Sequence, residues 1–367
     1  MTRTVVMATG GTGGHIYPAV AVARELELRG YRTAFIGQKM GLEARLVPAE
    51  GLPFFGVRAG KWHRGRPDPR QAAQAALGLR DAVTLLRRLR PALVLGFGGF
   101  ASFPALAAAR VLGVPYALHE QNVLPGMVTR WFARGARFVA AAAVEVNAQL
   151  PVTAEVVGLP VREQRIAKRD ARRQLGLPEQ GTVTFVMGGS QGSAVLNRAV
   201  PEAFAALSET APDLYVLHSS GPAHLEGMRA HTAGRPRYRV DAFLESVLAW
   251  SAADLGITRG GNGTLAEAAF HGVPLLMVPL PSAAENHQLH NARAVEAAGA
   301  GTVVEQTEIG LLAGMWGELL DPDVRAAMRA RARSRSPEGA AARLAGLVER
   351  TLRAAEPGER NTVQETL

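Results

Sequence analysis

The sequence predicts an α/β protein made of two similar domains, each with a parallel sheet covered by helices. Apolar, strand-like segments alternate with helix-like segments along the chain, which is typical of parallel sheets buried on both faces. The order of strand, glycine-rich turn and helix occurs in residues 4–30 and recurs in residues 182–200. The length of 367 residues also suits two domains, each large enough to bury its own core.

The elements of the first domain follow from its apolar runs. TVVMAT predicts a strand at 4–9, which is followed by a helix at 16–29 and a second strand at 32–36. Three further strands are predicted at 92–96, 115–118 and 138–142.

The second domain begins after a change in amino-acid composition. Residues 152–169 combine Gly and Pro with mixed charge, so we expect a linker there. The strand, turn and helix pattern then recurs, and it occurs a third time at 253–272. We therefore expect domains at residues 1–160 and 161–337, and a flexible tail at 357–367.

Composition excludes several classes of function. Cysteine is absent, which rules out disulfides, thiolate metal sites and cysteine nucleophiles. Hydrophobic residues make up 47% of the chain and charged residues 20%, as in globular proteins. No run of about 18 uncharged apolar residues occurs, and the first residues lack the pattern of a secretory signal, so we expect a cytoplasmic protein.

Positive charge is concentrated in one stretch. The net charge is +9, and residues 58–90 hold nine Arg or Lys against two Asp. Such a stretch suits nucleic acid, an anionic membrane surface or a polyanionic substrate. Trp62 is the only aromatic residue interleaved with this charge, so we expect no nucleic acid partner.

The three glycine-rich turns indicate phosphate binding. A strand that runs through glycines into a helix presents unpaired backbone N–H groups at the positive end of that helix. The alternative is a tight turn that serves only packing. GGTGGH at 10–15 is not G-x-G-x-x-G, and the second strand lacks an acidic ribose-binding residue, so a dehydrogenase is disfavoured. No P-loop motif occurs, so a P-loop nucleotidase is disfavoured as well.

GGSQG at 188–192 supports a different class of function. It matches G-x-S-x-G, the nucleophile elbow of α/β-hydrolases, with Ser190 as nucleophile. Asp241 or Asp254, with His271 or His287, would then complete a triad in the order Ser, Asp, His. We keep an α/β-hydrolase as the alternative.

Six stretches, taken in order, resemble one bacterial family. They are TGGTGGHIYP (9–18), LGFGGFAS (95–102), LHEQN (118–122), GLPVR (158–162), GGSQGS (188–193) and HQLHNA (287–292). Their order and spacing are similar to those of the MurG family of peptidoglycan glycosyltransferases over nearly the whole chain. That family transfers N-acetylglucosamine (GlcNAc) from UDP-GlcNAc to the 4-hydroxyl of MurNAc in undecaprenyl-pyrophosphoryl-MurNAc-pentapeptide (lipid I), which gives lipid II.

The resemblance implies a fold, a reaction and a set of partners. The fold is GT-B, with two Rossmann-like domains across a cleft and a final helix, here at about 338–356, packed back on the first domain. The transfer inverts the anomeric centre and needs no metal or other cofactor. The implied partners are UDP-GlcNAc, the lipid-linked acceptor and the anionic inner face of the cell membrane, where the protein is peripheral. A GT-B transferase with another acceptor stays open.

The resemblance also implies the residues of the donor site. Ser190 and Thr264 would contact the diphosphate, and Glu267 would accept hydrogen bonds from the ribose. Phe243 and the Leu244 backbone would contact the uracil, and Gln288 with His287 would contact the sugar. The implied donor set is Arg162, Ser190, Phe243, Leu244, Asn262, Gly263, Thr264, Leu265, Ala266, Glu267, His287 and Gln288.

In the first domain the family's pattern implies the acceptor site and the base. His15 would take the proton of the attacking hydroxyl, with Glu120 as the alternative base or as its orienting partner. The loop residues between donor and acceptor would be Thr12, Gly13, Gly14 and Asn122, and those that bind the acceptor Gly98, Gly99, Phe100 and Ser102. Leu159, Phe100, Asn286 and GGNGT at 260–264 depart from the family's usual residues.

Two further segments have competing interpretations. The helix-like stretch 71–91 carries Arg80, Arg87, Arg88 and Arg90 near apolar residues. It is interpreted as a membrane-surface helix or as a helix that covers the sheet with a solvated basic face, and the two interpretations are compatible. Asp321-Pro322-Asp323 has the form of a metal-binding D-x-D, but it directly precedes a helix-like run. We interpret it as a helix cap and expect no metal site.

Overall fold

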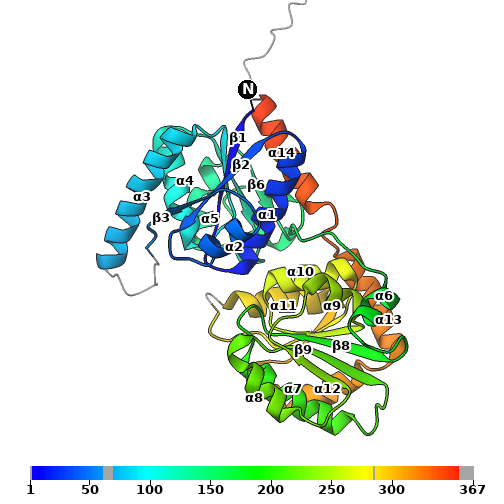
Figure 1. The fold of residues 1–367 in the computed structure, drawn as a ribbon. Helices are drawn as coiled ribbons and strands as arrows, with labels where there is room; N and C mark the ends of the chain where they lie inside the picture. The colour runs from blue at the N-terminus through cyan, green and yellow to red at the C-terminus, as the bar shows by residue number, and fades with distance from the viewer. Residues whose placement is uncertain (1, 61–68, 284–285, 355–367) are drawn as a thin grey trace, which may run out of the picture.

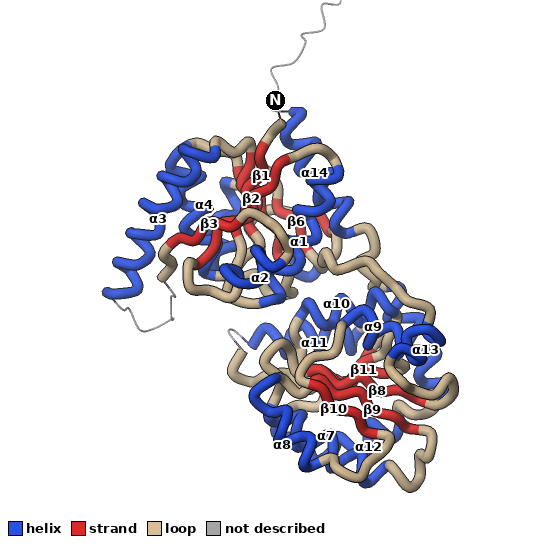
Figure 2. The backbone as a smooth tube through the Cα atoms, viewed as in Figure 1, coloured by secondary structure: helices blue, strands red, loops and turns tan. Residues whose placement is uncertain are grey.

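Two parallel sheets, one in each half of the chain, organise the molecule (Figures 1 and 2). The structure is a computed structural model that describes residues 2–60, 69–283 and 286–354. The expected tail at 357–367 and Trp62 lie outside the described residues. Helices cover both faces of each sheet, as the alternation of strands and helices predicts.

The first sheet has seven strands in the order β3-β2-β1-β4-β5-β6-β7, all parallel. Its strands and helices are β1 (Thr4–Ala8), α1 (Gly13–Leu28), β2 (Arg32–Gln38), α2 (Glu43–Ala49), β3 (Phe54–Val57), α3 (Pro69–Leu89), β4 (Leu93–Gly96), α4 (Phe103–Leu112), β5 (Tyr116–Glu120), α5 (Met127–Phe132), β6 (Val139–Ala141) and β7 (Glu155–Val156).

The second sheet has six parallel strands in the order β10-β9-β8-β11-β12-β13. Its elements are α6 (Lys168–Gln174), β8 (Thr182–Met187), α7 (Ala194–Leu207), β9 (Leu214–Ser219), α8 (Leu225–His231), β10 (Tyr238–Asp241), α9 (Ser246–Ala252), β11 (Leu255–Thr258), α10 (Asn262–His271), β12 (Leu275–Met277), α11 (His287–Ala297), β13 (Gly301–Val303), α12 (Leu312–Glu318) and α13 (Pro322–Ser334). A last helix, α14, spans Ala340–Ala354.

Each sheet contains one point at which the strand order reverses. In the first sheet the chain runs outward from β1 to β3 and then returns to add β4 on the other side of β1. In the second sheet the same reversal separates β8 from β11. Because neighbouring loops leave in opposite directions at such a switch point, the carboxyl ends of its two strands border an open crevice that binds ligands in this class of sheet.

The structure differs from the predicted elements of the first domain and the linker in three places. Helix α1 begins at Gly13 and not at Ile16, so His15 lies in its first turn. The predicted linker 152–169 contains β7, which pairs with β6, and the first residues of α6. Both residues of β7 are exposed, so no apolar alternation marked this short edge strand. Strand β3, also not predicted, is partly buried at the other edge of the sheet.

The C-terminal helix completes the core of the first domain. After α13 the chain returns, and α14 packs against α1 (Figure 1). Leu344, Leu347 and Val348 lie in the same buried cluster as Val5 and Leu26. Arg29 at the end of α1 forms an ion pair with Glu349 at 2.7 Å. The helix that follows the second domain in sequence therefore stabilises the first.

Truncation of Leu344 tests this packing. Leu344 is fully buried, so Leu344→Ala should lower the free energy of unfolding of the first domain by about 2–5 kcal/mol through lost burial and a residual cavity. Hydrogen exchange measured by mass spectrometry should speed up in β1 and α1 and stay unchanged in β8 and β9. Arg353→Ala on the exposed side of α14 serves as the control. Equal acceleration in both sheets would contradict the assignment of α14 to the first core.

Candidate active site at the domain junction

The two switch points face each other where the domains meet. Helix α1 follows β1 at the first switch point, and α10 follows β11 at the second. The two helix N-termini are in contact, because a Cβ added to Gly263 would lie 3.7 Å from the Cα of Gly14. Unpaired N–H groups and positive helix ends from both domains thus converge on one place, which favours anions.

A buried carboxylate shapes the glycine loop before α1. Glu43, which is fully buried, accepts hydrogen bonds from the N–H groups of Gly11 at 3.1 Å and Gln38 at 2.7 Å. A Cβ on Gly10 would lie 2.1 Å from the Glu43 carboxylate, so only glycine leaves room for it. Sequence reasoning missed Glu43, because its partners are backbone N–H groups, which no sequence motif reveals.

The imidazole of His15 is held by its own helix turn. Its Nδ1 lies 2.8 Å from the Thr12 hydroxyl, with which it shares a hydrogen bond. The other edge of the ring faces Gly98, where a Cβ would lie 3.6 Å from Nε2. Burial, and secondly the charge of His287, lower the pKa of His15 to about 4. The ring is therefore neutral at neutral pH and able to accept a proton.

The loop after β4 closes against the glycine loop. Gly99 has φ +73°, and a Cβ there would approach the Gly10 carbonyl oxygen to 2.6 Å, so glycine is required. The Phe100 ring lies beside Gly11, and the buried Ser102 hydroxyl donates to the Gly99 carbonyl oxygen at 2.8 Å. The structure thus brings the predicted acceptor residues Gly98, Gly99 and Phe100 next to Gly10, Gly11 and His15.

Glu120 has contacts different from those we expected. The structure places Thr12, not Glu120, at the His15 ring. The buried Glu120 carboxylate instead accepts hydrogen bonds from the N–H groups of Gln121, Asn122 and Gly126, from the Thr129 hydroxyl and from the Asn122 side-chain amide. Five donors leave this carboxylate suited to hold the loop 121–126, and we assign it no proton transfer.

In the second domain the turn after β8 presents Ser190 to solvent. Helix α7 begins only at Ala194, capped by the Ser193 hydroxyl, which accepts from the Leu196 N–H. A Cβ on Gly192 would lie 1.8 Å from the Ser220 carbonyl oxygen, so the loops after β8 and β9 touch through their backbones. Ser190 therefore sits at the second switch point, in an exposed turn.

The first two turns of α10 contain the predicted run Asn262 to Glu267. The helix starts after Gly261 without a side-chain cap, which leaves its first N–H groups available to a ligand. Glu267 accepts a hydrogen bond from the indole N–H of Trp250 at 3.1 Å. Burial raises the pKa of Glu267 to about 7, although this hydrogen bond acts in the opposite direction.

Arg162 and the loop after β10 border the same junction. The Arg162 guanidinium lies 3.4 Å from Glu245 in the second domain and 3.9 Å from Glu50 in the first. Glu245 also caps α9 by accepting from the Leu248 N–H. Phe243 is 59% exposed, whereas Leu244 packs on the core of the second domain.

Residues at the start of α11 support the loop before α10. The side-chain oxygen of Gln288 accepts from the N–H groups of Gly260 at 3.2 Å and Leu280 at 3.0 Å. Contact with a sugar would therefore come from its NH₂ group. His287 begins the same helix, near enough to His15 to lower its pKa. The buried Arg259, which sequence reasoning missed, donates to the Val278 and Pro279 carbonyl oxygens below this loop.

The residues of the alternative hydrolase triad are dispersed. Asp254 pairs with Lys168 and Arg172, and His271 shares a hydrogen bond with Ser251. Asp241 pairs with Arg239. Within the described part of the chain, no hydrogen bond joins Ser190 to a histidine. The nucleophile-elbow interpretation of GGSQG is therefore wrong.

The D-x-D stretch is a helix cap, as predicted. The Asp321 carboxylate accepts from the N–H groups of Asp323 at 2.8 Å and Val324 at 3.1 Å, and Pro322 starts α13. Among the described residues, no group of three His, Asp or Glu side chains is arranged to hold a metal ion. No helix in the described ranges is long and apolar enough to cross a membrane.

Solved structures with the same architecture define the class. The crystal structure of Acinetobacter baumannii MurG superposes with a TM-score of 0.79 at 28% identity, over 95% of this chain and 100% of that one. CalG4, the calicheamicin glycosyltransferase, gives a TM-score of 0.68 at 20% identity over 97% and 100% of the two chains, which shows the shared fold alone. Together with the facing switch points, this similarity defines a glycosyltransferase of the GT-B class.

Sequence comparison narrows this class to one family. Residues 5–141 match the glycosyltransferase family 28 N-terminal domain, and residues 183–344 match its C-terminal domain. The chain belongs to glycosyltransferase family 28. A Deinococcus radiodurans relative is 49% identical over 96% of both chains, and one from Thermus thermophilus is 43% identical over 94% of this chain and 99% of its own. Both are named UDP-N-acetylglucosamine--N-acetylmuramyl-(pentapeptide) pyrophosphoryl-undecaprenol N-acetylglucosamine transferase.

The titration of Glu267 has a consequence for stability. Its pKa rises from 4.5 to about 7 on folding, so the folded state holds the proton more tightly. Ionising Glu267 therefore destabilises the folded protein. This loss of stability is absent below about pH 4.5, grows as pH rises and is complete above about pH 7. Glu267→Gln, which still accepts from Trp250, should therefore unfold like the parent at pH 4 and be more stable at pH 8, by on the order of 1–3 kcal/mol.

Urea titrations of both proteins across this pH range measure the difference. Glu226→Gln, at an exposed site on α8, is the matched control and should show no such trend. A stability difference independent of pH would show that folding does not shift the pKa of Glu267.

Proposed function

We propose that this chain transfers GlcNAc from UDP-GlcNAc to the 4-hydroxyl of MurNAc in lipid I, giving lipid II, with inversion and without a metal or other cofactor. Relatives that are 49% and 43% identical over nearly the whole chain carry this activity in their names, which supports both substrates. The observation that carries the mechanism is the contact between the N-termini of α1 and α10. One helix end suits the diphosphate of the donor and the other that of the lipid.

His15 is the proposed base. The ring is neutral because its pKa is lowered to about 4. In the tautomer whose Nδ1–H donates to the Thr12 hydroxyl, the lone pair is on Nε2, on the side of Gly98. A sugar hydroxyl there would lose its proton to Nε2 as its oxygen attacks the anomeric carbon. The bond from that carbon to the diphosphate oxygen breaks, and the carbon inverts.

The second domain supports the departure of UDP. Negative charge that develops on the diphosphate meets the open N–H groups of α10, where Asn262, Gly263 and Thr264 form the first turn, and the exposed Ser190 turn. Glu267 lies within the first two turns of that helix and would accept from ribose hydroxyls once ionised. Phe243, exposed beside the junction, offers a ring face to the uracil.

Each domain is assigned one of the two substrates. We assign residues 1–160, with α14, to the lipid acceptor and residues 161–337 to the nucleotide sugar. A GT-B transferase that uses another acceptor would keep the donor half, so the acceptor is the part that direct assay must establish.

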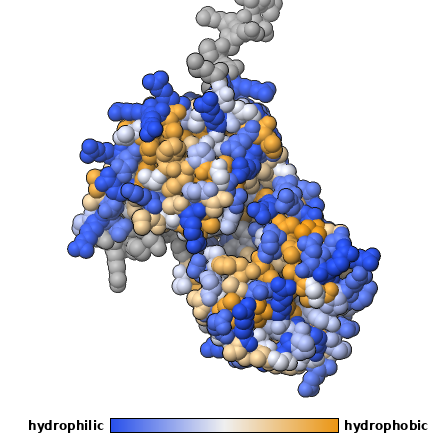
Figure 3. Space-filling model, viewed as in Figure 1, coloured by the Kyte–Doolittle hydropathy of each residue, from blue (hydrophilic) through white to orange (hydrophobic). Residues whose placement is uncertain are grey.

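We further propose that the protein binds the inner face of the cell membrane through the first domain. The apolar side of α3 is not available for this, since Leu86 is buried and Val83 and Leu89 pack on the core beside it. Helix α3 therefore covers the sheet with this side. Its exposed arginines still project outward, and Figure 3 shows hydrophilic side chains along the edge where Figure 1 places α3.

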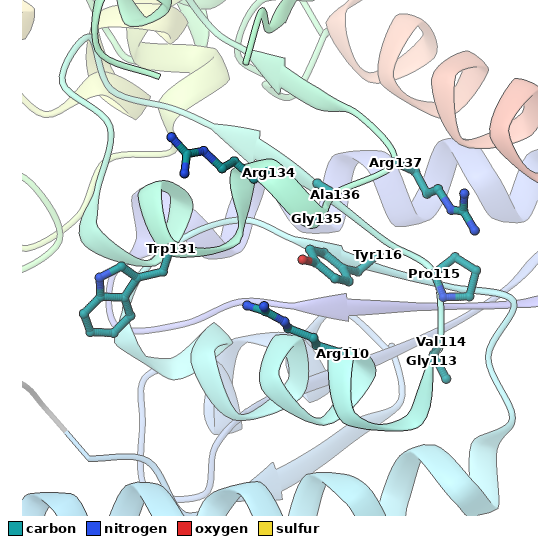
Figure 4. Close-up of a pocket in the computed structure, with 10 residues that line it drawn as sticks. All are labelled: Arg110, Gly113, Val114, Pro115, Tyr116, Trp131, Arg134, Gly135, Ala136 and Arg137. Atoms are coloured by element: carbon teal, nitrogen blue, oxygen red, sulfur yellow. The ribbon is translucent and has the colours of Figure 1, made fainter. Parts of the chain in front are cut away.

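A hollow of about 520 Å³ extends this basic surface. Arg110, Arg134 and Arg137 lie around Tyr116, with the half-exposed Trp131 at the rim (Figure 4). Arg110 lies in the last turn of α4, and the other two precede β6, so all three lie at the amino edge of the sheet, where α3 also ends. Guanidinium groups beside an interfacial tryptophan suit anionic lipid headgroups.

Transfer in the presence of EDTA tests the reaction. With UDP-GlcNAc and a soluble lipid-linked MurNAc-pentapeptide analogue, the protein should release UDP and form the GlcNAc–MurNAc product at an unchanged rate in EDTA. His15→Ala should lower kcat by about 10²–10⁴-fold with a donor Kd similar to that of the parent. His290→Ala, on the exposed side of α11, is the control.

Two results would contradict this mechanism. Release of UDP only after a divalent metal is added would remove the metal-free reaction. A His15→Ala variant with near-normal kcat would remove His15 as the base.

Vesicle binding tests the basic surface. The combined Arg110→Ala, Arg134→Ala and Arg137→Ala variant should bind vesicles of equal parts phosphatidylglycerol and phosphatidylcholine on the order of a hundredfold more weakly, at about 1 kcal/mol per arginine. Cosedimentation measures the affinity, and added salt should weaken it. The matched control replaces Arg198, Arg229 and Arg331, which are exposed on the second domain. Equal losses for both triple variants would show that only net charge matters.

A further inference from the structure

One buried amide on α11 connects the two domains. Asn291 is only 1% exposed, although it lies where the second domain meets the first. Its side-chain oxygen accepts from the Val123 N–H at 3.1 Å, and its NH₂ group donates to the Asn122 side-chain oxygen at 3.2 Å. Both partners belong to the loop after β5 in the first domain.

The NH₂ group of Asn291 also donates a hydrogen bond within the second domain. It lies 3.5 Å from the Gly260 carbonyl oxygen, in the loop that leads into α10. Gln288, one turn earlier on α11, accepts from the Gly260 N–H. Two side chains on one face of α11 therefore hold the loop that starts α10.

The first-domain partner of Asn291 is itself fixed. Asn122 donates to the Glu120 carboxylate through its backbone N–H at 3.0 Å and its side-chain NH₂ at 3.3 Å. Glu120 is anchored in turn by Gly126 and Thr129. A continuous chain of hydrogen bonds thus runs from the first sheet, through Glu120, Asn122 and Asn291, to the loop before α10.

We propose that Asn291 is a positioning residue, which sets the two domains in the register at which the N-terminus of α10 faces the glycine loop and His15. This inference rests on the proposed transfer, because it concerns the geometry of that reaction. Asn291 touches neither the His15 ring nor the first turn of α10, so it acts through the loops that carry them.

The chemistry of the site selects an amide. The position needs one acceptor, for the Val123 N–H, and donors for two oxygens. Aspartate supplies the acceptor but faces the Asn122 and Gly260 oxygens without a proton to share. Alanine supplies neither and leaves a buried N–H without a partner, which is costly.

Domain geometry and catalysis are measured together to test this. The chain has no cysteine, so Leu28→Cys in the first domain and Leu311→Cys in the second, both exposed, give a unique pair of spin labels. Asn291→Asp and Asn291→Ala should broaden the distance distribution between the labels. In unlabelled protein both should lower kcat by about tenfold or more and leave the Kd of UDP within about twofold of the parent. His290→Ala on the same helix should change none of these quantities.

The outcomes separate this inference from the proposed function. Parent protein that forms no product would contradict the proposed transfer, whereas the label distances still report on the domain register. Unchanged distances and kcat in folded Asn291 variants would overturn the positioning role. Weaker UDP binding with unchanged distances would also overturn it, since Asn291 would then support only the Gly260 loop. Asn291→Asp, which keeps size and one hydrogen bond, provides the folded variant if Asn291→Ala fails to fold.

Discussion

The close approach of two helix N-termini is the constraint on which the rest of the site depends. Helices α1 and α10 meet at Gly14 and Gly263, each with a positive end and open N–H groups directed at the junction. Two such ends repel each other unless negative charge lies between them. The fold therefore brings together an arrangement that is more favourable with an anion bound than without one, and two diphosphates are the anions that the proposed reaction supplies.

The same positive surroundings explain the state of the neighbouring titratable groups. His15 stays neutral because desolvation and a neighbouring histidine lower its pKa at the head of α1. Protonation would add a cation where cations are already disfavoured. Glu43 and Glu120 lie behind the loops and accept from backbone N–H groups, which fixes loop shape at some distance from the reacting atoms. Both carboxylates are therefore structural, because the hydrogen bonds that they accept fix the loops.

The sequence was sufficient for the architecture and for the residues that local motifs mark. Parallel strands produce buried apolar runs, and glycine turns before helices mark the switch points, so both domains and three phosphate-directed turns were predicted. The short edge strands β3 and β7 were not predicted, because they lack a long buried run. Strands β9, β10, β12 and β13 of the second domain were not predicted individually either, because only the segments beside the glycine-rich turns were assigned there. Glu43, Arg259 and Asn291 escaped because their partners are mainly backbone groups distant in sequence, which leave no periodic signal.

The polar nature of the domain junction suits an enzyme that must open. Asn291 and Arg162 join the domains through hydrogen bonds and a half-exposed ion pair. Each such hydrogen bond contributes about 0.5–1.5 kcal/mol net, so breaking a few of them costs little more than thermal fluctuations provide on the timescale of domain motion. An apolar seam of similar size would hold the site closed. The side-chain amide of Asn291 instead favours one relative position of the domains each time they close. Only in that position do both its oxygen and its NH₂ group have hydrogen-bond partners in the first domain.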